Sequence, residues 1–302
     1  MELYDLRAFV SVVEHGSVTR AARELNRVPS GITTRIMQLE DYLGVKLFLR
    51  EKKRLLITPL GQTFYEHAKR VLDLMSEGER QVKNAGPGGK LRIGAMESTA
   101  AVRLPERLAA LHNFHPAIEL ELITGTSRGL YQRLLENQLD VIFAADVPQD
   151  GRVERVPVFE ERLVVIAPAG HEEIREPSDM ACKTLLAFAE GCSYRNRLLS
   201  WCRSHGMAPE KVVELSSYHA IMAATAAGMG AGIVPDSVLD VFPNPGTLAI
   251  FPMEPDLGRA VTELLWRAGM FSPNIQALKN VCARPKILPK KGGTWGKFIM
   301  SG

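Results

Sequence analysis

The first 58 residues combine three short amphipathic helices with a basic hairpin, and this pattern limits the fold more than any other feature of the chain. The first helix is predicted from one apolar stripe: Leu3, Leu6, Val10 and Val13. Ser17 is a favourable N-cap for a second helix, and residues 26–29 separate that helix from a third. Two apolar runs, 45–49 and 55–57, flank a basic turn and predict a β-wing. We therefore predict a winged helix-turn-helix at residues 1–58.

The third helix of this head has polar side chains near its start. Its apolar face is formed by Ile32, Ile36, Leu39 and Leu43, which leaves the opposite face free to enter a major groove. The residues expected at or near base edges are Ser30, Thr33 and Thr34. The residues expected at phosphates are Arg27, Arg35, Arg50, Lys52, Lys53 and Arg54. Double-stranded promoter DNA is the predicted partner, because a solvated three-helix core does not explain the wing.

Positive charge is concentrated at the two ends of the 302-residue chain. The net charge is +3, of which residues 1–58 contribute +3 and residues 281–302 contribute +5, leaving −5 for the centre. An acidic centre repels DNA, so DNA binding is expected at the head. The tail, residues 283–302, is basic, lacks periodicity and is predicted to be disordered.

The chain begins without a signal-peptide pattern, and its early part has no apolar run long enough to span a membrane. A cytoplasmic location with no membrane partner is therefore expected. The four cysteines have no metal-ligand spacing, so we predict reduced thiols and no cofactor or metal.

A long helix with one apolar stripe is predicted from Pro59 to about residue 83. The stripe consists of Phe64, Ala68, Val71, Leu72 and Met75. We expect it to pack against a second copy of the chain, with packing against its own head as the alternative. A Gly- and Pro-rich hinge follows at 85–89, so residues 59–89 are interpreted as a linker helix and hinge.

Beyond the hinge, strands alternate with helices in two similar runs. The predicted strands are 91–96, 118–122 and 141–145 in the first run, and 184–188, 212–215 and 231–234 in the second. This order favours parallel sheets. Two segments, 163–167 and 248–266, cross between the runs. We predict an α/β domain at 90–282 with a cleft, like the periplasmic solute-binding proteins. Its lobes are expected at about 90–162 with 267–282, and at about 163–266.

Each predicted strand-to-helix turn carries hydroxyl groups, at the sheet edge where open parallel sheets bind ligands. The expected effector-binding residues are Ser98, Thr99, Thr126, Ser127, Ser193, Tyr194, Arg195, Ser217, Tyr218 and His219. Any one of these hydroxyls is also an ordinary N-cap, so the prediction depends on all four turns together. Arg195 suits a carboxylate, with an exposed surface arginine as the alternative. An organic anion or an amino-acid-like metabolite is the expected small-molecule effector.

The head closely resembles the LysR-type transcriptional regulators. The matching segments are 6–9, 16–17, 21–25, 30–36, 38–40, 43–44, 47–50 and 56–61. The remainder of the chain fits the length and layout of that family. The chain departs from the pattern at Pro29, where the family commonly has a base-contacting Gln, and at Thr33, where it commonly has Ser. Proline excludes an amide contact to bases at position 29.

The resemblance implies a transcriptional regulator rather than an enzyme. It implies that Arg50 lies at the wing, that the linker helices pair antiparallel in a dimer, and that two dimers form a tetramer. It also implies that the two-lobed domain senses an effector and that the assembly contacts RNA polymerase.

Two alternatives stay open at this point. A thiol-responsive regulator would act through Cys192 and Cys202, and a cytoplasmic solute-binding protein would have no role on DNA. An enzyme is not predicted, because the sequence has no P-loop and no nucleophile elbow. The glycine-rich run at 228–232 precedes a predicted strand, whereas a dinucleotide loop follows one.

Overall fold

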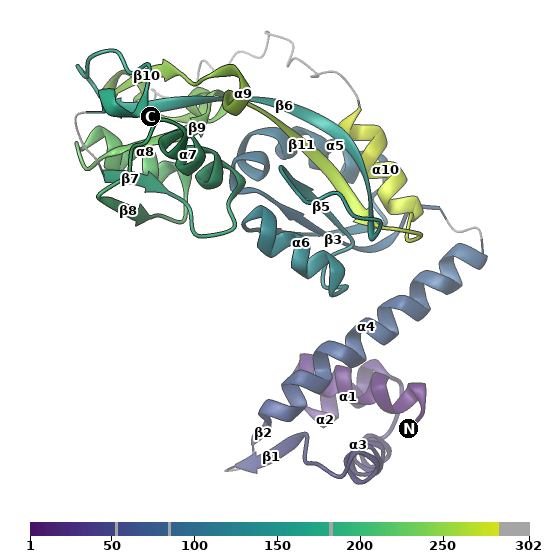
Figure 1. Cartoon of the computed structure of the whole chain (residues 1–302). Helices are drawn as coiled ribbons and strands as arrows, with labels where there is room; N and C mark the ends of the chain where they lie inside the picture. The colour runs from purple at the N-terminus through teal and green to yellow at the C-terminus, as the bar shows by residue number, and fades with distance from the viewer. Residues whose placement is uncertain (52–53, 84–85, 181–183, 284–302) are drawn as a thin grey trace, which may run out of the picture. The chain divides into compact units, whose positions relative to one another are not determined.

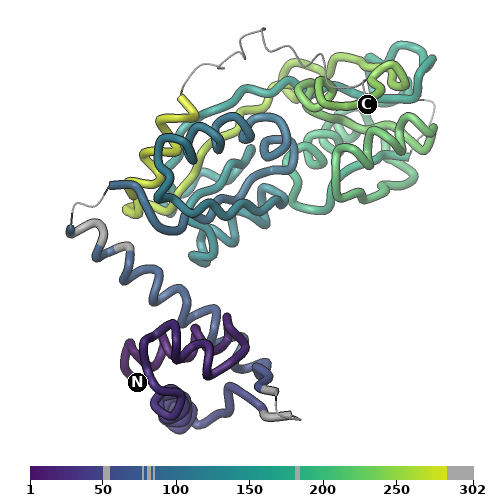
Figure 2. Tube along the Cα trace, turned by 180° about the vertical axis from the view of Figure 1, so that it is seen from behind, coloured from purple at the N-terminus to yellow at the C-terminus, as the bar shows by residue number. Residues whose placement is uncertain are grey.

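A computed structural model of the chain describes residues 1–51, 54–83, 86–180 and 184–283. The chain forms two compact units, Met1–Gly86 and a second unit that begins at Pro87. Both can be followed along the chain in Figure 1 and, from behind, in Figure 2. Residues 284–302, which hold nearly all of the predicted basic tail, lie outside the described residues. None of the described helices is long and apolar enough to cross a membrane.

The first unit contains four helices and a two-stranded ribbon in its described residues. These are α1 (Leu3–His15), α2 (Val18–Glu24), α3 (Pro29–Leu43), β1 (Phe48–Glu51), β2 (Arg54–Ile57) and α4 (Pro59–Val82). Ser17 caps α2 by accepting a hydrogen bond from the Arg20 N–H, and Gly44 ends α3 in a left-handed conformation with φ of 70°. The winged helix-turn-helix prediction is confirmed. The first wing strand begins later than expected and extends to Glu51, and the second begins one residue earlier, at Arg54, so both ends of the predicted turn belong to strands.

Phe9 lies at the centre of the first unit and is fully buried. Its ring contacts Phe48 of the wing at 5.5 Å and Phe64 of α4 at 5.3 Å between ring centroids. Lys69 and Tyr65 of α4 also donate to the Glu14 carboxylate of α1, at 3.0 and 3.1 Å. The first part of α4 therefore packs against the head of its own chain, which is the alternative given for its apolar stripe. The exposed apolar residues farther along α4 are Val71, Leu74 and Met75.

Glu40 connects the third helix to the wing. Its Oε1 accepts hydrogen bonds from the backbone N–H groups of Leu47 and Phe48, at 2.9 and 3.1 Å. Its Oε2 accepts from Lys46 Nζ at 2.8 Å, and only 7% of the side chain is exposed. Burial raises the pKa of Glu40, but Lys46 and the two backbone donors lower it further, so the net pKa lies below its usual value.

The second unit is an α/β structure. Its first half comprises β3 (Gly89–Ala95), η1 (Thr99–Arg103), α5 (Leu104–Phe114), β4 (Ile118–Thr124), α6 (Ser127–Leu135), β5 (Val141–Ala144) and β6 (Val153–Pro168). Its second half comprises η2 (Pro177–Asp179), β7 (Thr184–Ala187), α7 (Ser193–Ser204), β8 (Lys211–Glu214), α8 (Tyr218–Ala226), β9 (Ala231–Pro235), η3 (Asp236–Val241), η4 (Pro245–Thr247), β10 (Leu248–Pro252), α9 (Pro255–Gly258), β11 (Arg259–Arg267) and α10 (Pro273–Cys282).

The strands of this unit follow the order β4-β3-β5-β11-β6-β9-β7-β8, and β10 pairs with β6. Strands β4, β3 and β5 are parallel in the first lobe, and β8, β7 and β9 are parallel in the second. The two long strands β6 and β11 run antiparallel through both lobes, as Figure 1 shows. The predicted pair of similar lobes with two crossovers is therefore present.

One lobe boundary, expected between residues 266 and 267, lies earlier in the chain. Residues 263–266 of β11 pair with β5, so they belong to the first lobe rather than to the second. The crossover thus lies within β11 itself, because a single strand supplies both sheets. The other expected boundary, near residue 162, coincides with the point where β6 begins to pair with β9.

We predict that Glu40→Ala lowers the free energy of unfolding by about 3 kcal/mol, because two buried N–H groups lose their acceptor. Glu40→Gln keeps an acceptor oxygen and should cost less. Urea unfolding of the full chain measures both. The pKa of Glu40 is lowered in the folded state. Its contribution to stability is therefore complete above pH 4.5, the ordinary pKa, and is lost as the pH falls through the pKa of the folded state. Equal stability of Glu40→Ala and the wild type would contradict the proposed stabilising connection between α3 and the wing through Glu40.

Candidate functional site

The two lobes of the second unit touch at the start of α6. The Arg128 N–H donates to the Gly191 carbonyl at 3.1 Å. Gly191 has φ of 85°, and a Cβ there would lie 2.9 Å from the Arg128 Cβ, so a side chain at this position would force the lobes apart. Two pockets lie beside this contact, and both are lined by Ser127.

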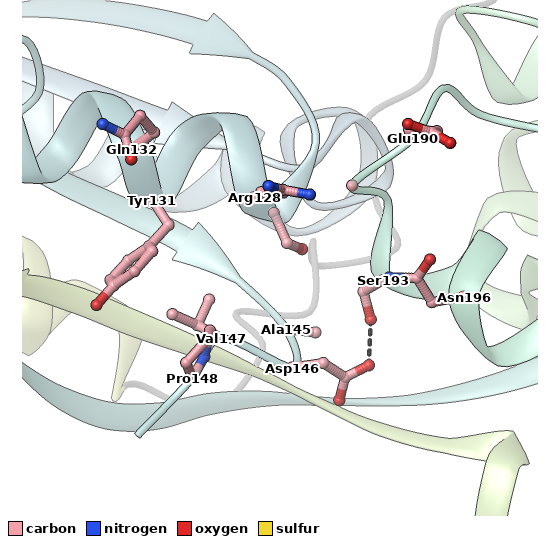
Figure 3. A pocket seen from close by; sticks show the side chains of 12 residues that line it. Arg128, Tyr131, Gln132, Ala145, Asp146, Val147, Pro148, Glu190, Ser193 and Asn196 are labelled. Atoms are coloured by element: carbon pink, nitrogen blue, oxygen red, sulfur yellow. Dashed lines mark hydrogen bonds between the residues drawn. The ribbon is translucent and has the colours of Figure 1, made fainter. Parts of the chain in front are cut away.

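The outer cavity has a volume of about 540 Å³ and opens between the lobes. Figure 3 shows its lining, with Arg128 and Gln132 from α6, Asp146 after β5, and Glu190, Ser193 and Asn196 from the second lobe. The cavity therefore offers charged and amide groups from both lobes. A volume of this size accommodates a small metabolite.

The inner pocket has a volume of about 20 Å³, which is room for about one water molecule. It is lined by Met96, Glu97, Gly125, Thr126, Ser127, Phe188, Cys192, Tyr194 and Tyr218. Four of the predicted effector residues therefore meet here: Thr126, Ser127, Tyr194 and Tyr218. Met96, Glu97 and Phe188 were not predicted from the sequence, although Glu97 directly follows the first predicted strand.

Several buried polar atoms without hydrogen-bond partners lie in or next to the inner pocket, because Glu97 and Tyr194 line it and Ser98 and Thr99 directly follow Glu97 in the chain. Such side-chain atoms occur at seven of the described residues, and five of these are Glu97, Ser98, Thr99, Tyr194 and Thr262. Each unpaired buried group costs about 1–3 kcal/mol, and native proteins keep few of them. Ser98 and Thr99 stand at the start of the π-helical turn η1, a conformation found often at functional sites.

The phenol of Tyr194 lies among these hydroxyl groups. Burial raises the pKa of Tyr194 well above its usual value, and nearby Glu161 raises it further. The hydroxyls of Thr262 and Ser98 approach closely enough to offset part of that rise, yet none of the three groups makes a hydrogen bond of ordinary geometry. They are therefore available to donate to, or accept from, a bound molecule.

An ion pair joins the lobes at the edge of the outer cavity. Arg197 of α7 binds Asp146 through two hydrogen bonds of 2.7 Å, and the Ser193 hydroxyl donates to the same carboxylate (Figure 3). Arg197 also donates to the carbonyls of Leu257 and Arg259, at 2.9 and 2.8 Å. Burial raises the pKa of Asp146, but Arg197 and Ser193 outweigh it and the net pKa is lowered. Asp146 was not predicted from the sequence, although it too directly follows a buried strand.

Arg195, selected as a carboxylate partner, is already engaged within the chain. Its Nη1 donates to the Phe188 carbonyl at 2.9 Å and to the Glu214 carboxylate. Its binding of a ligand carboxylate stays a prediction, and the guanidinium would have to exchange partners to do so. Arg195 lines neither of these two pockets, but it lines a third of about 10 Å³ together with Phe188 and Tyr194, which also line the inner pocket.

Three of the predicted effector residues cap helices or lie at the surface. Thr126 caps α6 by accepting from the Gly129 N–H at 3.2 Å, and Ser217 caps α8 by accepting from the Ala220 N–H at 3.1 Å. His219 is exposed, with its ring 6.4 Å from that of Phe242. Ser217 and His219 are absent from the linings of both pockets.

In the first unit, α3 presents an exposed polar face. Ser30 and Thr34 are exposed on it, and the Thr34 hydroxyl donates to the Ser30 carbonyl at 3.0 Å. Thr33 is half-buried and donates to the Pro29 carbonyl at 3.0 Å. Val28, Met37 and Gln38 are also exposed on or beside α3, and the sequence analysis did not select them. The helix can thus present hydroxyl, amide and methyl groups to base edges.

The cations of this unit divide into two groups. Arg35 donates to Glu2 and Asp5 at 3.0 and 3.1 Å, so it holds α3 against the start of α1. Arg27 is exposed and lies 5.7 Å from the centre of the Tyr4 ring. Two further arginines, Arg20 and Arg23 of α2, are exposed and were not selected from the sequence. Lys52, Lys53 and the side chains of Arg50 and Arg54 lie outside the described residues.

The two cysteines of the thiol alternative are both buried. Burial raises the pKa of Cys192 and of Cys202, which disfavours the reactive thiolate. The described residues include no group of three or more His, Cys, Asp and Glu side chains arranged to hold a metal. A redox switch through these thiols is therefore not favoured.

Comparison with known families matches both units. Residues 3–62 match the family described as bacterial regulatory helix-turn-helix protein, lysR family, and residues 84–284 match the LysR substrate binding domain. An uncharacterised HTH-type transcriptional regulator, YusT of Bacillus subtilis, is 34% identical over 272 residues, or 90% of this chain and 91% of YusT. The HTH-type transcriptional regulator SoxR of Arthrobacter sp. is 32% identical over 286 residues, or 93% of this chain and 97% of SoxR.

Two solved structures have a fold similar to that of the whole chain. A full-length OxyR variant from Pseudomonas aeruginosa is similar with a TM-score of 0.66 and 26% identity, covering 93% of this chain and 94% of that one. Full-length CbnR complexed with its target DNA has a TM-score of 0.65 and 24% identity, covering 93% and 99%. The similarity to CbnR supports the fold.

We predict that Asp146→Asn loosens the contact between the lobes, because the ion pair with Arg197 becomes a weaker neutral contact. Discounted for solvent exposure, the loss is about 1 kcal/mol, so the Arg128 amide should exchange its hydrogen about fivefold faster. Hydrogen exchange followed by mass spectrometry measures this. Glu173→Gln, which breaks an exposed pair with Arg175 inside the second lobe, is the control. Unchanged exchange at Arg128 would show that the ion pair does not hold the lobes.

Proposed function

The chain belongs to the LysR family of bacterial transcriptional regulators, and we propose that its effector is held by the buried hydroxyls of Ser98, Thr99 and Tyr194. The observation that carries this proposal is the cluster of unpartnered polar atoms at the inner end of the cleft. A bound molecule would supply the missing hydrogen bonds and remove the cost of leaving them unmade.

The size of the inner pocket bears on how the effector binds. At about 20 Å³ the pocket is too small for a metabolite, so entry requires the lobes to separate. The adjoining outer cavity provides about 540 Å³ for the remainder of the molecule. An effector that fits one lobe arrangement better than another shifts the balance between them by its difference in affinity, and this shift is the regulatory signal.

We propose that α3 enters the major groove with Ser30, Thr33 and Thr34 at or near base edges. Arg27 and the wing residues Arg50, Lys52, Lys53 and Arg54 would bind phosphates, and Arg20 and Arg23 extend that basic surface. Arg35 supports the interface by fixing α3 to α1 through Glu2 and Asp5. These roles follow from exposure on α3 and from the basic composition of the wing.

The proposed assembly is a dimer or tetramer held in part by α4. Val71, Leu74 and Met75 are 45%, 50% and 41% exposed, which leaves an apolar surface for a second copy. Two heads can then bind two half-sites on one duplex, and effector-induced changes between lobes can alter their spacing. Such a protein would act in the cytoplasm, on promoter DNA and together with RNA polymerase. We propose no enzymatic activity, because the relatives are named as transcriptional regulators.

The division of roles on DNA is testable in a salt series. Arg50→Ala should weaken binding to all sequences and reduce the slope of log affinity against log salt by about 0.9, because one phosphate contact is lost. Thr34→Ala should leave that slope unchanged and alter discrimination between bases by about 1–3 kcal/mol. Electrophoretic shifts on promoter DNA and its single-base variants measure both. A uniform loss for Thr34→Ala would remove it from the base-reading group.

The effector site is testable by removing one unpartnered hydroxyl. Thr99→Val keeps the side-chain shape and should leave stability equal or slightly higher, because the Thr99 hydroxyl has no partner. The same variant should lose stabilisation by any metabolite that raises the melting temperature of the wild type. Thr225→Val, which removes a buried hydroxyl bonded to the Ile221 carbonyl at 2.9 Å, should lower stability and keep the metabolite response. A full response in Thr99→Val would refute the proposed site.

A further inference from the structure

The inner pocket combines one acid with three aromatic rings. Of its lining residues, Glu97 is the only one of the Asp, Glu, Lys, Arg and His types. Phe188, Tyr194 and Tyr218 supply the rings, and those of Phe188 and Tyr218 lie 4.7 Å apart at an angle of 57°. A carboxylate beside aromatic faces is an arrangement that attracts cations, because the ring faces carry negative potential.

Glu97 forms no salt bridge with a Lys, Arg or His side chain among the described residues. Its Oε2 is buried without a hydrogen bond, while the Tyr218 backbone N–H is the donor that reaches the carboxylate. Burial raises the pKa of Glu97, and the Tyr218 amide and His219 offset only part of that rise. The carboxylate is thus held at an energetic cost that a positively charged group would remove.

The arginines near the cleft do not supply that charge. Arg195 is bound to Glu214 and to the Phe188 carbonyl, and Arg197 is bound to Asp146. Arg128 lines the outer cavity rather than the inner pocket. Figure 3 shows Arg128 between the lobes, on the side facing Glu190. The inner pocket is therefore lined by one acid and by aromatic rings, so its charge favours a cationic group over an anionic one.

We propose that the effector carries a protonated amino group, which binds Glu97 beside the rings of Phe188 and Tyr218. This inference rests on the proposed function, since it names the chemical class that the cleft selects. The ammonium donates to Oε2, the unpartnered hydroxyls of Ser98 and Thr99 complete the polar contacts, and the outer cavity holds the remainder of the molecule. An α-amino acid or a simple amine satisfies this arrangement, and a purely anionic metabolite does not.

A thermal-shift panel on the full chain tests the ligand class. The probes are primary amines and α-amino acids, together with carboxylic acids and alcohols of the same carbon skeletons. Members of the amine group should raise the melting temperature, and the matched acids and alcohols should not. Titration of the best amine should show binding about 10- to 100-fold weaker for Glu97→Gln, the range expected for a charged hydrogen bond. Glu160→Gln, which removes an exposed acid on β6, should bind as the wild type does.

A second measurement needs no ligand. The pKa of Glu97 is raised in the folded state. Its carboxylate therefore lowers the stability of the fold as the pH rises above the pKa of the unfolded chain, and this loss of stability is present at neutral pH. Glu97→Gln should therefore raise the melting temperature of the free protein at neutral pH, and Glu160→Gln should not. This result also shows that the variant folds.

The results of these experiments distinguish the proposed effector site from the proposal that the effector carries an amino group. Amine binding that persists unchanged in Glu97→Gln, or a panel in which no amine stabilises the wild type, overturns the amine proposal. If acids or alcohols stabilise the protein instead and Thr99→Val abolishes that effect, the cleft remains the effector site without an ammonium. If no compound of any class stabilises the chain, both proposals fail together.

Discussion

The pairing of β6 with β11 is the constraint on which the second unit depends. Each strand contributes to both lobes, since β11 pairs with β5 in one lobe and β6 pairs with β9 in the other. Their own register runs from Arg259 opposite Arg162 to Arg267 opposite Val153, and it shifts between Thr262 and Glu263. Such irregularities bend a strand locally. The Thr262 hydroxyl at this point is also buried without a partner, so the bend lies beside the proposed binding site.

The cleft contains charged pairs that are satisfied within the chain, and it also contains one carboxylate, that of Glu97, and several hydroxyl groups that are not. Arg103 binds Glu161 at 2.7 and 2.9 Å, and Arg197 holds Asp146 in the same bidentate manner. These pairs fix the crossover strands and the closed contact between lobes. Ser98, Thr99 and Tyr194 have no such partners, so the binding energy available to a ligand is concentrated at the inner end. Specificity then follows from unpaired polar groups, which penalise any molecule that fails to satisfy them.

Periodic features could be predicted from the sequence, and contacts between distant segments could not. The head and the two runs of strands and helices can be predicted from the spacing of apolar residues, because each element buries one face and its apolar residues recur at a regular interval. The apolar stripe of α4 packs against the head only near its start, where Phe64 contacts Phe9 of α1. Farther along the helix, Leu74 stays exposed, and the sequence does not show where this change occurs. Likewise Asp146 and Arg197 are 51 residues apart, in different lobes, and no local pattern pairs them. Residue type identified Arg195 as a ligand-binding candidate, but Glu214 occupies its guanidinium.

The central claim is that one molecule bridges both lobes at the inner end of the cleft. Hydrogen exchange of the full chain, with and without a compound that raises its melting temperature, tests this claim most directly. The account predicts that the compound protects the amides of η1 and the start of α6 in one lobe together with the start of α7 in the other. Protection confined to a single lobe, or located away from these three helix starts, would contradict it.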